Sequence, residues 1–185
     1  MAEAFTNKLV RAAGIVSTTD STAAIGANAT AITNIQTANL HVGDLVVNQN
    51  FRAGAKIREI TNSSAVVVDR ASTNTSATTS QIVKFLGVTT AFTSSGTEKS
   101  ILIGGTFANL TENDINISVE ILDNSAVGTA NSTSLLASDI PIPSGSSFVI
   151  SEAGKTVLEQ NDQVKIYCDT ANAVDVTLAI LSGVS

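Results

Sequence analysis

Period-two alternation of apolar and polar side chains is the feature that most constrains how this chain can fold. It is clearest in residues 163–168 (QVKIYC) and returns in residues 174–180 (VDVTLAI). Such alternation buries one face of a strand and leaves the other solvated, as in antiparallel sheets. Residues 86–185 show no convincing helical period. The pattern therefore predicts an all-β chain.

Short strand patterns separated by turn residues divide the chain into parts. Residues 15–85 favour a small β domain, in which residues 56–69 read as a hairpin turning at TNSS. Residues 86–185 favour an antiparallel β-sandwich, of jelly-roll or immunoglobulin-like type. The strands expected there are 97–107, 115–122, 133–137, 147–151, 156–159, 163–168 and 173–181. We thus predict an all-β fold with a small N-terminal β domain followed by a sandwich.

Residues 1–14 precede any strand pattern that we recognise. Phe5, Leu9 and Val10 are apolar and Arg11 is basic, so this segment is either a docking arm for another subunit or a solvated tail. We carry forward the docking arm as the prediction.

Charge is distributed unevenly along the 185 residues. Residues 1–85 have a net charge of +2 and residues 86–185 of −8, which together make the net charge of −6. Nucleic-acid binding is not expected, because the basic part has no dense patch and aromatic residues make up only 4% of the chain. No signal peptide is visible, and no apolar run approaches the ~18 residues of a membrane span, so no membrane association is expected.

Residues that could carry chemistry are few. His41 is the only histidine and stands three residues before Asp44 in one turn, which is not the geometry of a catalytic triad. Cys168 is the only cysteine and lies in an alternating strand, where a small buried side chain is expected. We therefore predict no enzyme activity, no metal site and no cofactor.

Basic side chains concentrate at one place, at Arg52, Lys56, Arg58 and Arg70. Lys56 and Arg58 are two residues apart and share one face of the expected strand. The cluster is either a solvated outer face or a docking site for an acidic partner. Together with the N-terminal segment it makes up the predicted interface.

The second half resembles a β-sandwich module of tailed-bacteriophage virion proteins. The resemblance rests on KSILIGGTFANLT (99–111), LASDIPIPSGSSFVIS (136–151), KTVLEQNDQVKIYCDT (155–170) and AVDVTLAIL (173–181). The segment VGDLVVNQNFRAGAKIREITNSSAVVVDRASTNT (42–75) is similar to small β units of phage head and tail accessory proteins. The N-terminal MAEAFTNKLVRAAGIV, taken with residues 99–111, resembles structural proteins of marine cyanophage myoviruses. One departure is that Gln160 and Asn161 stand where the module usually has glycine.

The resemblance implies a structural protein of the virion, assembled in the cytoplasm of the host bacterium. We expect an accessory protein of the head or neck, such as a capsid decoration or collar protein. Its partners would be other virion proteins and further copies of itself, since many weak identical contacts add up on a symmetric shell. A tail or baseplate component, or a receptor- or glycan-binding adhesin module, remains the alternative.

Overall fold

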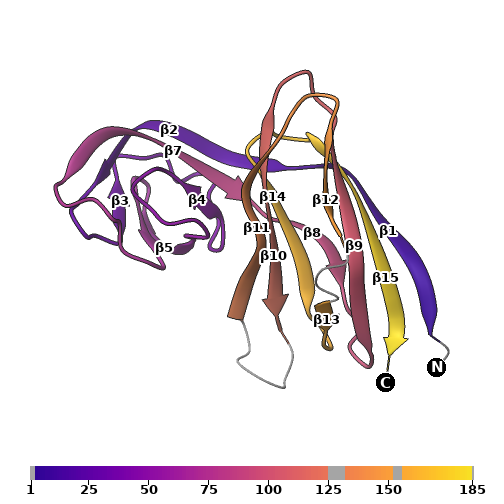
Figure 1. Ribbon diagram of the computed structural model, residues 1–185. Helices are drawn as coiled ribbons and strands as arrows, with labels where there is room; N and C mark the ends of the chain where they lie inside the picture. Colours follow the sequence, from indigo (N-terminus) through magenta and orange to yellow (C-terminus); the bar gives the residue numbers. More distant parts are fainter. Residues whose placement is uncertain (1–2, 125–131, 152–155, 185) are drawn as a thin grey trace. The chain divides into compact units, whose positions relative to one another are not determined.

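The computed structural model describes residues 3–124, 132–151 and 156–184, and these residues form strands and no helix (Figure 1). The all-β prediction is confirmed. No helix that could span a membrane occurs in this part of the chain. The chain divides into two compact units, one made of Met1–Gly14 with Thr89–Ser185 and the other of Ile15–Val88.

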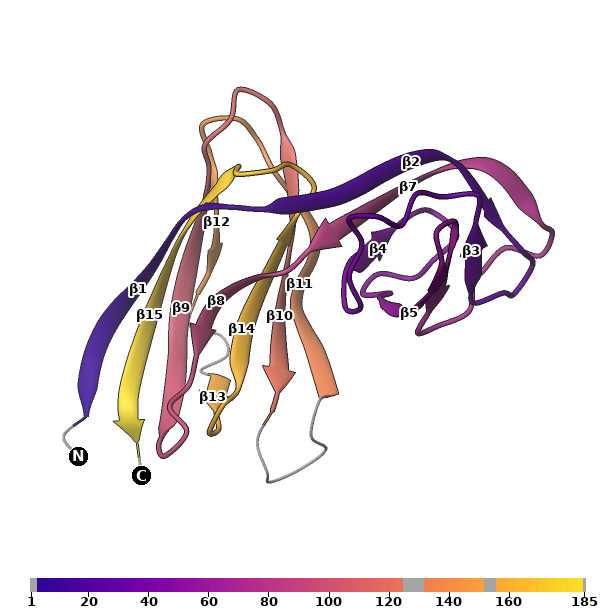
Figure 2. The ribbon, with the colours of Figure 1, turned by 180° about the vertical axis from the view of Figure 1, so that it is seen from behind.

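The first unit is a sandwich of two antiparallel sheets. One sheet has the order β1-β15-β9-β12, with β13 also paired to β9, and the other has the order β11-β10-β14-β8. Figure 2 shows the strands of both sheets from behind. Their bounds are β1 Ala4–Ala13, β8 Thr89–Thr93, β9 Lys99–Asn109, β10 Ile115–Asp123, β11 Ser132–Ile142, β12 Ser147–Ile150, β13 Thr156–Leu158, β14 Gln163–Cys168 and β15 Val174–Val184.

The pairing of these strands is nested from the ends of the chain inward. β1 pairs with β15, β8 with β14, β9 with β12 and β13, and β10 with β11, all antiparallel. Two further antiparallel pairings, of β15 with β9 and of β14 with β10, join these nested pairs into the two sheets. This is the strand order of a jelly roll, with β12 and β13 together in the place of one strand. Of the two sandwich types expected, the connectivity therefore matches the jelly roll.

Alternation along the strands builds the core of the sandwich as the sequence pattern requires. Val174, Val176, Leu178 and Ile180 of β15 are buried, and they pack with inward side chains of the other strands. Phe107 and Phe148 face each other with ring centroids 6.0 Å apart. Val, Ile and Leu make up most of the core, with Ala, Phe and Cys in the remaining positions, and the β-branched Val and Ile suit a pleated, half-buried surface.

The second unit is one six-stranded sheet with the order β4-β7-β2-β3-β6-β5. It has a core of its own that includes Ile32, Val66 and Phe85. Backbone hydrogen bonds join the residues just before β4 to the start of β5, with Gly43 N–H donating to the Ile57 carbonyl at 2.8 Å and Ile57 N–H donating to the Asp44 carbonyl at 3.0 Å. The strands are β2 Ile15–Ile25, β3 Ala31–Thr33, β4 Leu45–Val47, β5 Ile57–Asn62, β6 Ala65–Val68 and β7 Thr78–Gly87. The expected hairpin is β5–β6.

The N-terminal segment differs from the expected docking arm. Ala4–Ala13 form β1, which pairs with β15 along most of its length and belongs to the sandwich unit. The β domain is therefore inserted between the first and second strands of the jelly roll, instead of preceding the sandwich, and it ends at Val88 instead of residue 85. The physical reason is that β15 has an edge with which β1 can pair. Ala13 of β1 is also part of the sandwich core, and Val10 packs against that core.

Candidate interaction surface

Strand β1 presents large apolar side chains to solvent. Phe5 is 77% exposed and Leu9 is 70% exposed, although both lie in a regular strand. Val10 points to the other side and packs against the sandwich core. Since side chains alternate between the two faces of a strand, Phe5 and Leu9 lie on the outer face of the five-stranded sheet. Arg11 is also exposed and follows Val10, where the register of β1 with β15 shifts.

Two rows of uncharged side chains cross this outer face from β1 to the opposite edge. In the first row Phe5 pairs with Leu181, Leu181 with Ile101, and Ile101 with Val157. Facing residues of neighbouring strands lie on the same side of the sheet, so their side chains form a continuous band. Val157 at the far end of the band is 51% exposed.

The second row runs parallel to the first. Leu9 pairs with Thr177, Thr177 with Thr106, and Thr106 with Val149, which is 54% exposed. Between the rows lie small or neutral residues, because Asn7 pairs with Ala179 and Ala179 with Gly104. We call these residues the outer face: Phe5, Asn7, Leu9, Ile101, Gly104, Thr106, Val149, Val157, Thr177, Ala179 and Leu181. None of them carries a charge.

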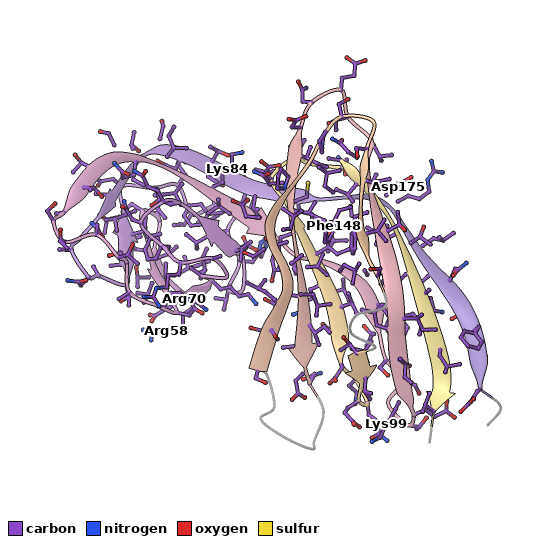
Figure 3. The ribbon with its side chains drawn as sticks, viewed as in Figure 1. Arg58, Arg70, Lys84, Lys99, Phe148 and Asp175 are labelled. Carbon is purple, nitrogen blue, oxygen red and sulfur yellow. The ribbon has the colours of Figure 1, made fainter. Side chains whose placement is uncertain are left out.

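Charged groups lie at the margin of the outer face. Asp175 of β15, labelled in Figure 3, accepts a hydrogen bond from the backbone N–H of Ala12 at 2.8 Å. This contact uses the carboxylate to cap the irregular end of β1, where Ala12 has a φ of 52°. The outer face thus has no charged side chain and has exposed large apolar side chains along both of its edges. Such apolar surface is typical of a site that contacts another molecule.

The predicted basic cluster lies wholly on the inserted unit. Arg70 donates from Nε and Nη2 to the two carboxylate oxygens of Asp69, both at 3.3 Å, and from Nη1 to the carbonyl of Ala53 at 3.1 Å. Arg58, labelled with Arg70 in Figure 3, is exposed on β5. Arg52 is also exposed, and Lys56 is half-buried at a bridge to Leu45. Arg70 is thus held in place by its neighbours, and Arg52 and Arg58 present their charge to solvent.

The eight predicted interface residues therefore fall into two groups of four, one on each compact unit. Of the predicted residues of β1, Phe5 and Leu9 belong to the outer face, whereas Val10 packs on the core. Asn7 and the outer-face residues of the other strands were not among the predicted residues. Their signal was present in the sequence, since Thr177, Ala179 and Leu181 are the outward members of an alternating strand and none is charged.

His41 and Asp44 line a shallow cavity of about 390 Å³ in the inserted unit, together with Ile15, Val42 and other residues. The Asp44 carboxylate is buried and accepts a hydrogen bond from the backbone N–H of His41 at 3.0 Å, while Asp44 N–H donates to the His41 carbonyl at 3.1 Å. These contacts make Asp44 a cap of its own turn. Within residues 3–124, 132–151 and 156–184, no three potential metal ligands converge.

Comparisons with known proteins add nothing to this surface: no protein-family model matches the chain, and no curated protein matches it.

Proposed function

We propose that this chain is a non-enzymatic structural protein of a tailed-bacteriophage virion, most consistent with an accessory protein of the head or neck. The observation that carries the proposal is the outer face of the jelly roll. It combines exposed Phe5 and Leu9 on one side with exposed Val149 and Val157 on the other, and has no charge between them. An exposed, uncharged face of this kind suits packing against another protein surface.

The fold agrees with this role. Double-sheet jelly rolls occur in viral capsid proteins and in lectins, so the fold by itself leaves a structural and a sugar-binding role open. The repeated, weak and identical contacts of a symmetric shell would turn a modest apolar face into firm attachment.

Aromatic exposure favours the structural role over a glycan-binding one. Sugar sites use exposed rings against the faces of the sugar. The chain has six Phe and one Tyr, all in described residues, and Phe5 alone is exposed. The other rings are buried or half-buried, so a sugar would find a single ring on an otherwise aliphatic surface.

The proposal is tested on purified particles of the phage that encodes the chain. We expect the chain to remain with particles through density-gradient banding, at a fixed number of copies relative to the major capsid protein by quantitative mass spectrometry. Recovery of the chain only in the soluble fraction of the lysate would overturn the proposal. Hundreds of copies would indicate a decoration protein, whereas a small multiple of three or six would place the chain in the neck, tail or baseplate.

Attachment through the outer face is tested with variants of the same purified chain. Val149→Asp places a charge in the second row of uncharged side chains at an exposed position, so folding should be retained. Ile82→Asp, at a 64% exposed position of the inserted unit, is the matched control. Particles lacking the chain should rebind the control and lose binding of the Val149→Asp variant. Equal rebinding would show that attachment uses another surface.

A further inference from the structure

Strand β1 leaves one of its edges open. Its only neighbour in the sheets of the described residues is β15, and in both ribbon views it is the last strand of its sheet (Figures 1 and 2). An open edge offers a row of backbone N–H and C=O groups to a strand of another chain. The question is which strand fits there.

The other edges of the sandwich are less suited to adding a strand. β12, β13 and β8 have only four, three and five residues. The long edge strand β11 contains Pro141 and a left-handed Asp139 (φ 51°), and its register with β10 shifts twice. Proline and bulges are the features by which proteins block edge pairing. β1 has no proline, and its register is unbroken from Ala4 to Val10.

We propose that a second copy of this chain pairs with β1, with the two β1 strands antiparallel about a two-fold axis that passes between the two Asn7 residues. Asn7 is the middle residue of the regular segment Ala4–Val10. An interface on such an axis uses the same patch of both copies, so the segment must be complementary to itself when reversed.

The sequence of β1 meets this requirement on the outer face. With Asn7 on the axis, Phe5 faces Leu9 of the second copy and Leu9 faces Phe5. Glu3 and Arg11 lie just beyond the two ends of the regular segment Ala4–Val10, and continuing the register by one residue at each end brings them opposite each other. Both are exposed in the single chain. Apolar side chains thus meet apolar ones and the two opposite charges meet each other, which are the pairs that stabilise neighbouring strands.

Neighbouring registers that keep the same faces together lose these pairs. With the axis at Lys8, the two Lys8 side chains face each other and Phe5 faces Arg11. With the axis at Thr6, Leu9 faces Glu3. Like charges directly opposite each other are destabilising, and an apolar side chain opposite a charged one gives up the favourable apolar pair. The Asn7 register, which keeps the apolar pairs and opposes no like charges, is therefore the one selected.

Pairing of β1 would join two five-stranded sheets into one continuous sheet. The two uncharged rows that end at Phe5 and Leu9 would then continue into the rows of the second copy. The pairing does not depend on the proposed function, because it follows from the edge itself whatever surface the chain binds.

The register is tested by disulfide trapping. Facing Cα atoms in an antiparallel pair lie about 4.5–5.5 Å apart, within the span of a disulfide. We expect the N7C variant to form a covalent dimer on mild oxidation, with Cys168 silent because it is fully buried. T177C is the control, since Thr177 is exposed on the same face but lies one strand further in and faces Leu9 instead of Asn7. Its two copies would therefore be displaced both across the strands and along them, and would lie roughly 20 Å apart. Equal cross-linking of both variants would overturn the register.

Charge reversal tests the Glu3–Arg11 pair in solution. Sedimentation equilibrium at low salt should show a dimer of the unmodified chain. E3R or R11E alone should weaken dimerisation roughly tenfold, since each reversal creates two like-charge pairs, and E3R/R11E together should restore it. Val157→Asp, on the far side of the same face, should leave it unchanged. A chain that stays monomeric, a double variant that is not rescued, or N7C trapped only on a different virion protein would overturn the proposal.

Discussion

Gly14 is the residue at which the chain leaves β1 for the inserted unit, and it tolerates no side chain. Its φ is 119°, and a Cβ added there would lie 2.4 Å from the carbonyl oxygen of Thr170 and 3.1 Å from the Cβ of Cys168. Asn172 N–H also donates to the Gly14 carbonyl at 3.0 Å, so this corner is fixed against the turn before β15. Both the backbone conformation and the close approach therefore require glycine.

We expect Gly14→Ala to lower the free energy of unfolding of the sandwich by about 2–4 kcal/mol, the sum of left-handed strain and overpacking. Urea unfolding followed by tyrosine fluorescence measures this, because the single Tyr167 is buried in the sandwich and the chain has no Trp. Gly145→Ala is the control. Gly145 also has a positive φ, of 69°, but nothing lies within 4 Å of its added Cβ, so about 1 kcal/mol is expected. Equal losses in the two variants would contradict the steric argument.

Local conformation and hydrogen bonding in turns can also be inferred in part from the sequence. Asn161 stands where the resembling module usually has glycine, and its φ of 67° is a left-handed conformation that asparagine adopts more readily than most residues. The next residue, Asp162, is buried, and its carboxylate accepts hydrogen bonds from the backbone N–H groups of Asn124 and Glu159, both at 2.9 Å. The Glu159 contact follows from local turn chemistry. The contact to Asn124 joins residues far apart in sequence and could not be predicted.

At the scale of strands, prediction succeeded where one face is apolar and failed where neither is. β14 was predicted with its bounds of Gln163–Cys168. β2, Ile15–Ile25, was missed because its centre is the polar run STTDST, in which Asp20 is buried and accepts hydrogen bonds from Thr22 and Gln36. β1 was read as an arm because its alternation is weak, with Thr6 and Lys8 on the same side as Val10. Only pairing with β15, a long-range contact, makes it a strand.

Because β1 is a strand, substitutions at two neighbouring residues should change the stability of the sandwich by very different amounts. Val10→Asp should lower the free energy of unfolding of the sandwich by about 2 kcal/mol, because a charge replaces a side chain that packs on the core. Leu9→Asp should change it by less than about 0.5 kcal/mol, because Leu9 is 70% exposed. Tyr167 fluorescence during urea unfolding, at concentrations that keep the chain monomeric, measures both. A free arm would show no difference between the two variants.

At the scale of the whole molecule, the sequence did not predict that one unit is inserted within the other along the chain. The sequence pattern separated a first β region from a second one, close to residue 88 where the structure divides them. It could not show that residues before the first region complete the second. The pairing of β1 with β15 joins residues more than 160 positions apart, and no local pattern reports such a contact.

The inserted unit should therefore be removable without loss of the jelly roll. Its two ends are close, since β2 and β7 pair from Ile15 and Gly87 onward, and Gly14 N–H donates to Thr89 Oγ1 at 3.4 Å within the sandwich. The two cores share no residue. Insertions between close chain ends are tolerated because closing a longer loop costs little, and the reverse change, a shorter loop, should be tolerated for the same reason.

We expect a variant that joins Gly14 to Thr89 through two glycines, omitting residues 15–88, to fold as a sandwich. Its urea transition by Tyr167 fluorescence should lie close to that of the full chain, because every residue of the sandwich core is retained. Residues 15–88 made alone should give a separate cooperative transition by circular dichroism, and the full chain should show both. Loss of the Tyr167 transition in the shortened variant, with residues 15–88 still folding alone, would mean that the jelly roll depends on its insertion and that the two units fold as one.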